Sequence, residues 1–245
     1  MHEFYSLGID FALTQSKRLP VALLHSHALG SQLQPIPILP PYGPGLAAVF
    51  DPKARAHFIH ERTQWFLELN NALPHPVQVV GFDAPTCFCP PHIPMRKPEK
   101  HIRSLGCGIF KTPTEATLRN KTEHALAELT HNPKALRGGF SVWMLLAIEW
   151  AQELSQHVTL IEVFPNFFWK QYFGSDHKKQ VTLHEKQALL LRQGVKEIDY
   201  AAQWGQVNAE DAIDAAYCAW VAARYKMQKG VGFVGDQTDA IYYAL

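Results

Sequence analysis

The chain has 245 residues, of which 47% are hydrophobic and 18% charged, and its 23 Lys and Arg nearly balance its 22 Asp and Glu. This composition excludes a largely disordered chain, and the balanced charge argues against a protein that coats nucleic acid through net charge alone, while leaving a local basic patch open. With four cysteines, no apolar run of about 18–20 residues and no signal-peptide pattern at the N-terminus, we expect a soluble, cytoplasmic protein without a membrane partner.

The first part of the chain predicts three strands followed by a helix. Apolar runs at residues 4–12, 21–24 and 46–50 are typical of strands, and the Pro- and Gly-rich segment 35–45 predicts an irregular loop. A proline then opens a helix near 53–72. We expect the inward face of this helix to carry Ala56, Ile59, Phe66 and Leu69.

The rest of the chain alternates buried strands with helices. Val77–Phe82 and Val158–Phe164 are apolar runs typical of buried parallel strands. Residues 84–116 hold six prolines and three cysteines, which predicts a long insertion loop. Helical patterns cover 122–130, 140–156, 166–174, 182–194 and 209–228, and a hairpin is expected in 231–245. This order predicts one α/β domain over residues 1–245, with a mixed sheet and helices on both faces.

Three of the predicted core strands each carry one acid among apolar residues: Asp10, Asp83 and Glu162. An ionised carboxylate in such a setting is costly unless it is paired or binds a cation. One such acid is explained by a hydrogen-bonded core residue or a strand-end cap. Three acids on three strands, none with a basic partner on its own strand, indicate a shared site.

A late helix adds two further acids. Asp211 and Asp214 are three residues apart and share one helical face, where like charges repel unless a cation lies between them. The alternative for Asp211 is an ordinary acid of the first helical turn. Clustered carboxylates suit Mg²⁺ or Mn²⁺ better than zinc, and two such ions about 3.5–4 Å apart activate water and stabilise the leaving oxygen in phosphodiester cleavage.

Four short motifs in this order resemble those of the RNase H-like superfamily. More narrowly, the chain resembles an uncharacterised family of predicted nucleases, one of the numbered domains of unknown function, and its helical motif is similar to that of RuvC-type resolvases. The motifs are Gly8-Ile9-Asp10, Gly81-Phe82-Asp83-Ala84-Pro85, Ile161-Glu162-Val163-Phe164-Pro165 and Asp211-Ala212-Ile213-Asp214-Ala215.

The resemblance implies a mixed five-stranded sheet, with three antiparallel strands followed by parallel strands. It places Asp10 beside Asp83, brings Asp214 and Asp211 to them on the late helix, and leaves Glu162 at the edge of the site. It also implies substrate contacts from a basic residue and an acid after the fourth strand and from a lysine pair after the fifth. Those positions are Arg96 and Glu99, and Lys178 and Lys179. Phe11-Ala12-Leu13 departs from the small residues often found in relatives, which leaves open how a substrate approaches this edge.

A basic run close to Asp83 offers phosphate contacts for a nucleic-acid backbone, the alternative being a solvated surface loop. Its members are Arg96, Lys97, Lys100, His101 and Arg103.

Two further groups have competing interpretations. Cysteines 87, 89 and 107 with His92 lack a regular zinc spacing, so reduced structural thiols are favoured over a zinc site. The aromatic segment 164–173 offers rings for base stacking, but core packing of a helix is favoured.

These observations lead to one hypothesis and two alternatives. We expect a metal-dependent nuclease that holds Mg²⁺ or Mn²⁺, with two ions, through Asp10, Asp83, Asp214 and Asp211, with Glu162 as a further catalytic acid. The first alternative is a phosphotransferase or ATPase of the actin-like or sugar-kinase type, for which the nearest glycine-rich segments are 137–140 and 230–233. The second is a non-catalytic nucleic-acid-binding protein on the same fold.

Overall fold

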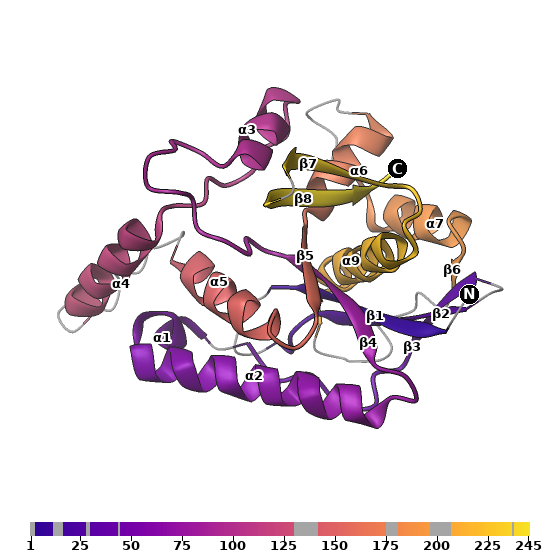
Figure 1. The fold of residues 1–245 in the computed structure, drawn as a ribbon, viewed down its shortest axis with the longest axis horizontal. Coiled ribbons are helices and arrows are strands. Elements are labelled where there is room, and N and C mark those ends of the chain that lie inside the picture. The colour runs from indigo at the N-terminus through magenta and orange to yellow at the C-terminus, as the bar shows by residue number, and fades with distance from the viewer. Residues whose placement is uncertain are drawn as a thin grey trace.

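Eight strands form one mixed sheet in the computed structural model, which describes residues 3–11, 17–27, 30–43, 45–129, 142–174, 181–196, 207–236 and 238–245 (Figure 1). Their order across the sheet is β6-β3-β2-β1-β4-β5-β8-β7. The strands are β1 (Phe4–Asp10), β2 (Val21–His27), β3 (Gly30–Gln34), β4 (Val77–Asp83), β5 (Thr159–Val163), β6 (Val195–Lys196), β7 (Val231–Asp236) and β8 (Asp239–Ala244).

Strand direction divides the sheet into an antiparallel and a parallel part. β2 is antiparallel to β1 and to β3, whereas β1, β4, β5 and β8 run parallel to one another. The short β6 adds in parallel to β3, and β7 folds back antiparallel on β8. Because β1, β4 and β5 are parallel, their carboxyl ends meet at one edge, which is where open α/β sheets bind their ligands.

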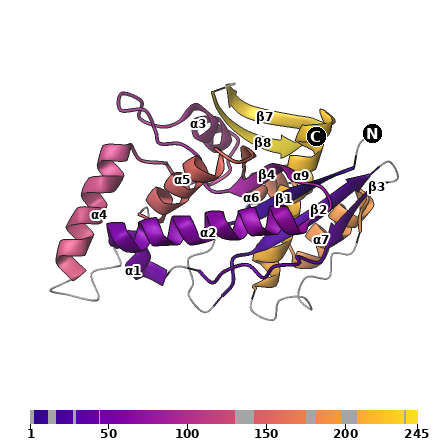
Figure 2. The same ribbon diagram turned by 60° about the horizontal axis from the view of Figure 1, so that its bottom comes forward.

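Helices cover both faces of the sheet. The helices are α1 (Gly45–Phe50), α2 (Pro52–Ala72), α3 (Lys97–Ser104), α4 (Glu115–Leu129), α5 (Trp143–Leu154), α6 (Pro165–Phe173), α7 (Leu183–Arg192) and α9 (Ala209–Met227). In Figure 1, α2 and α9 lie on opposite sides of β1 and β4, and Figure 2 shows α2 running in front of the sheet. None of the described helices is long and apolar enough to cross a membrane.

Alternate residues of β1 supply the two cores. Tyr5, Leu7 and Ile9 pack against α2 and α5, whereas Phe4 belongs to the core under α6, α7 and α9. This division follows from the two-residue period of a strand. It confirms the mixed α/β architecture with helices on both faces, although the sheet has eight strands instead of the five expected.

The third strand is not the one that the sequence predicts. Residues 46–50 belong to helix α1, and the strand beside β2 is β3. The α1 run is short and contains two alanines, which are strong helix formers, and Val49 and Phe50 are buried against Phe58 of α2. β3 reads Gly-Ser-Gln-Leu-Gln and buries only Leu33, so it carries no apolar alternation that would reveal a strand.

The inward face of α2 also differs from the expectation. Phe66 and Leu69 are buried and Ile59 is partly buried, but Ala56 is exposed. Arg55 is buried because its Nε donates to Glu149 Oε2 at 2.8 Å and its guanidinium donates to Val49 O. A buried arginine interrupts the apolar pattern on which the prediction of the inward face rests.

The predicted insertion loop and C-terminal hairpin contain more structure than expected. Segment 84–116 includes helix α3 and the start of α4. The expected hairpin is present as β7 and β8, and β8 also pairs in parallel with β5, which extends the main sheet.

Candidate functional site

The two strand acids, Asp10 and Asp83, lie side by side. Asp10 ends β1, Asp83 ends β4, and they are direct partners in the parallel register. Both side chains are partly buried. Among the residues that the structure describes, neither carboxylate has a hydrogen-bond or close ion-pair partner. The strand ends therefore present two adjacent carboxylates whose charge is not offset by a hydrogen-bond donor from the described part of the chain.

A pair of glycines explains why these carboxylates face α9. Gly8 and Gly81 are register partners and lie two residues before the two acids, so they share a face of the sheet with them. A Cβ added at Gly8 would lie 1.9 Å from Ala215 O, and one added at Gly81 would lie 2.2 Å from Cys218 O. The backbone of α9 thus rests directly on the two glycines, and only glycine permits this approach.

The close contact places the acidic start of α9 over the strand ends. Asn208 caps the helix, because its side chain accepts a hydrogen bond from Glu210 N. Asp211 and Asp214 follow in the first two turns. Asp214 Oδ1 accepts hydrogen bonds from Trp169 Nε1 of α6 at 2.7 Å and from Lys186 Nζ of α7 at 3.0 Å. Asp211 Oδ1 lies 3.4 Å from Asn208 Nδ2.

Burial and neighbouring carboxylates raise the pKa values of all four aspartates. Burial raises the pKa of Asp10 and of Asp83 well above the usual range of a carboxyl group, and the neighbouring carboxylates raise both pKa values further. Burial also raises the pKa of Asp214 and of Asp211. Such a cluster is stabilised when it takes up either a proton or a cation.

Lys186 is the cation that sequence reasoning missed. Its ammonium group pairs with Asp214 and lowers the pKa values of the strand acids. Helix α7 begins with a capping box from Thr182 and Glu185, and its buried side chains are Lys186, Leu189 and Leu190. A lysine on the apolar face of an amphipathic helix is the signal that would have identified it.

Glu162 lies on the other face of the sheet from this cluster, although its charge also raises the pKa of Asp83, and its catalytic role stays a prediction. It is the register partner of Phe82, whose side chain packs against α5, so the period of the strand turns it to the face opposite α9. Arg96 donates to both of its carboxylate oxygens, at 3.1 and 2.8 Å, and Thr86 N and Oγ1 donate to Oε2. Glu162 is thus an acid with full hydrogen bonding in the protein interior.

Arg96 and Glu99 are likewise interior residues, and their substrate contacts stay a prediction. Arg96 is 1% exposed and also donates from Nε to Asp239 Oδ1 at 3.0 Å. Glu99 is 1% exposed and accepts a hydrogen bond from Thr112 N at 3.1 Å. These contacts tie α3 to β5 and to the C-terminal hairpin.

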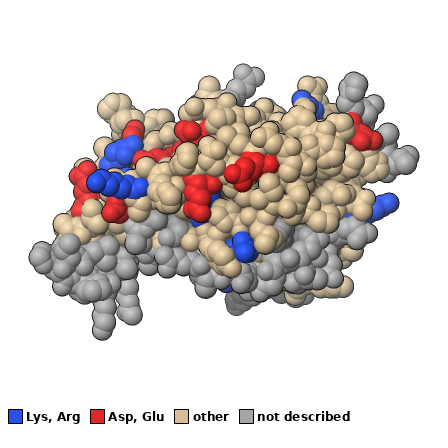
Figure 3. Space-filling model, turned by 90° about the horizontal axis from the view of Figure 1, so that it is seen from below, with Lys and Arg blue, Asp and Glu red and all other residues tan. Residues whose placement is uncertain are grey.

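The remaining predicted phosphate contacts have different outcomes. Arg103 is exposed and donates to Ile109 O at 3.1 and 2.8 Å, and Lys97 is exposed and pairs with Asp236. Lys178 and Lys179 lie outside the described residues, as does segment 137–140. The face covered by α2 shows Lys and Arg interspersed with Asp and Glu, without a continuous basic surface among its described residues (Figure 3).

The other candidate groups have structural surroundings. Cys87 Sγ lies 3.8 Å from Asp239 Oδ1, and Cys89 Sγ lies 3.3 Å from Ile93 O. In the aromatic segment, Phe168 stacks on Tyr217 with ring centroids 4.6 Å apart, as core packing predicts. Segment 230–233 leads into the strand β7 instead of a helix N-terminus, where phosphate groups usually bind.

The aspartates are near neighbours, but they do not form a complete metal cage. Within the described part of the chain, no group of three or more His, Cys, Asp or Glu side chains is arranged to hold a metal ion. Asp214 is turned toward Lys186 and Trp169, whereas Asp10 and Asp83 accept no hydrogen bond from any residue that the structure describes.

Comparison with known families assigns the chain to one of them. Residues 41–239 match the model of a family described as "Protein of unknown function (DUF429)", so the chain belongs to this family. No curated protein and no solved structure matches the chain significantly.

Proposed function

We propose that this member of the DUF429 family is a metal-dependent nuclease that hydrolyses phosphodiester bonds in DNA or RNA. The observation that carries the proposal is the pair Asp10 and Asp83, which lie side by side, have no hydrogen-bond donor among the described residues, and face the acids at the start of α9. A nucleic-acid partner and a cytoplasmic location are part of the same proposal.

The donor chemistry fits Mg²⁺ or Mn²⁺. The four aspartates supply only carboxylate oxygens, which are the ligands that these hard cations prefer. Asp10 and Asp83 would hold the ion, and Asp214 and Asp211 would be further ligands. We include a second ion, held by the same carboxylates, in the proposal. A bound divalent ion lowers the pKa of water and stabilises charge on a phosphoryl oxygen.

The chain's own residues prepare this site. The glycines under α9 fix the distance between the helix and the strand ends, and Lys186 and Trp169 orient the carboxylate of Asp214. Burial penalises the free negative charges of Asp10 and Asp83, so a cation between them relieves a cost that the folded protein otherwise bears.

The size of the pocket at the strand ends favours a nuclease over a phosphotransferase. This pocket has a volume of about 60 Å³, whereas sites that enclose a whole small-molecule ligand measure about 300–1,000 Å³. A nucleotide substrate of a kinase does not fit inside it, but part of a polymer that lies across the strand ends does.

A cleavage assay tests the proposal. The parent, Asp10→Asn and Asp83→Asn are incubated with single- and double-stranded DNA and RNA in Mg²⁺, in Mn²⁺ and in EDTA. Glu68→Gln, an exposed acid on α2, is the matched control. We expect metal-dependent cleavage by the parent and the control, and its loss in both aspartate variants. Equal cleavage by all four proteins, or none by the folded parent with either metal, would contradict the proposal.

A further inference from the structure

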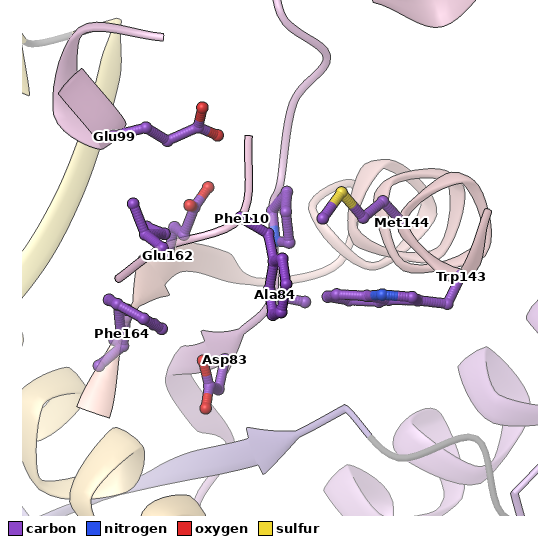
Figure 4. A pocket seen from close by; sticks show the side chains of 11 residues that line it. Asp83, Ala84, Glu99, Phe110, Trp143, Met144, Glu162 and Phe164 are labelled. Carbon is purple, nitrogen blue, oxygen red and sulfur yellow. The ribbon is translucent and has the colours of Figure 1, made fainter. Parts of the chain in front are cut away.

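A pocket adjoins Asp83 on the side of the sheet that faces α5. Asp83 and Ala84 line it from the end of β4, and Phe164 lines it from the end of β5. Trp143 and Met144 at the start of α5 and Phe110 from the α3–α4 connection complete most of its wall. Figure 4 shows Asp83 and Phe110 on opposite sides of Ala84, so the pocket shares the end of β4 with one of the candidate catalytic acids.

The wall chemistry favours a flat and uncharged occupant. Two aromatic rings and a thioether face the pocket from α5 and the α3–α4 connection, whereas Glu162 and Glu99 lie on the other side (Figure 4). A phosphate group would approach several carboxylates, which repel it. The cavity volume of about 60 Å³ is well below the roughly 300–1,000 Å³ of sites that enclose a whole small molecule, so it suits the edge of one ring system and not a whole nucleotide.

The aromatic wall is arranged before any ligand arrives. Trp143 stacks on Phe11 with ring centroids 5.9 Å apart and an angle of 24° between the rings. This contact holds the indole in place, so little rotamer freedom is lost when a ligand packs against it. Phe110 is 60% exposed and lines the same pocket as Trp143.

We propose that this pocket receives a nucleobase of the nucleic-acid substrate, with Phe110 and Trp143 as its aromatic contacts. The inference rests on the proposed function, because Asp83 belongs both to the pocket and to the carboxylate pair. A nucleotide whose phosphate lies at the strand ends can therefore direct its base into the pocket. A base enters such a pocket only when it is out of the duplex stack, so the substrate is single-stranded or locally unpaired nucleic acid.

The test separates base contacts from backbone contacts. Binding is measured in EDTA with a single strand of about 12 nucleotides, as DNA and as RNA, and with an abasic strand of the same length and charge. Stacking of a base on an aromatic side chain contributes enough that we expect the parent to bind the base-containing strand about 5- to 150-fold more tightly. Phe110→Ala removes this preference and leaves abasic binding unchanged, whereas Phe110→Tyr retains it.

The matched control is Phe233→Ala, which removes the same kind of ring from β7, where it is 50% exposed. It should keep the full preference. Equal binding of both strands by the parent, a preference that survives in Phe110→Ala, or no binding of either strand would each overturn the base pocket. Cleavage of the abasic strand in Mg²⁺, measured in parallel, tests the nuclease itself, so the two proposals fail separately.

Discussion

The contact between α9 and the glycine pair leads to the most detailed prediction. In Gly8→Ala, the added Cβ lies 1.9 Å from Ala215 O and 2.4 Å from Ala219 N, both of which are backbone atoms of a buried helix. An ordinary contact is 3.4 Å or longer, so α9 must move away by about 1.5 Å (3.4 minus 1.9 Å). No side-chain rotation relieves this overlap.

The displacement should reduce both stability and activity. Overpacking a core costs about 1–3 kcal/mol, and a clash between backbone atoms belongs at the upper end, about 3 kcal/mol. With a urea m-value of about 3 kcal/mol/M, the unfolding midpoint falls by about 1 M. The same movement carries Asp211 and Asp214 away from the strand acids, and a misplacement of about 1 Å lowers catalysis about 100-fold.

Urea unfolding followed by circular dichroism measures the change in stability. The control is Gly108→Ala, because nothing lies within 4 Å of a Cβ at that position. Gly81→Ala should resemble Gly8→Ala, since its Cβ would meet Cys218 O at 2.2 Å. The reasoning is refuted if Gly8→Ala unfolds at the same urea concentration as Gly108→Ala.

Three other perturbations have expected results. Burial raises the pKa of Asp10 above its unfolded value, so its contribution to the free energy of unfolding is retained at low pH and lost as the pH rises above about 4. In EDTA, the urea midpoint of Asp10→Asn should therefore exceed that of the parent by an amount that grows toward neutral pH. A difference that stays constant with pH would contradict this. Lys186→Met removes the ammonium partner of Asp214 and leaves the Trp169 hydrogen bond, which should lower the free energy of unfolding in urea by about 3 kcal/mol. Mg²⁺ should restore more stability to the variant than to the parent. An unchanged urea midpoint would rule out the pairing of Lys186 with Asp214. Arg96→Met leaves Glu162 buried without its guanidinium partner and should lower the free energy of unfolding by about 3–5 kcal/mol. In thermal unfolding, Arg96→Lys should recover only part of this loss, because lysine lacks the planar fork of arginine. Full recovery would argue against bidentate binding.

The placement of the strand acids follows from features within each strand. In Gly8-Ile9-Asp10 and Gly81-Phe82-Asp83, the continuous apolar runs predict buried parallel strands, and the spacing from glycine to aspartate puts both on one face. The small residues of α9 further predict a helix that lies close to the sheet. These local signals are enough to predict that the two acids are neighbours, because the register of β1 with β4 pairs Asp10 with Asp83.

Contacts between distant segments explain what the sequence did not reveal. Glu162 has the same kind of sequence context as Asp10, yet its position in the strand period and its pairing with Arg96, 66 residues away, turn it into an interior acid. Lys186 acquires its role only when α7 packs beside α9. β3 escaped prediction because its residues are polar and its pairing with β2 defines it.

The central claim is that Asp10 and Asp83 bind a divalent cation, and calorimetric titration with Mn²⁺ tests it most directly. The folded parent and the Glu68→Gln control should bind Mn²⁺, and Asp10→Asn and Asp83→Asn should lose this binding while remaining folded. The claim would be contradicted if the parent did not bind Mn²⁺, or if the two aspartate variants bound it with the same affinity as the parent.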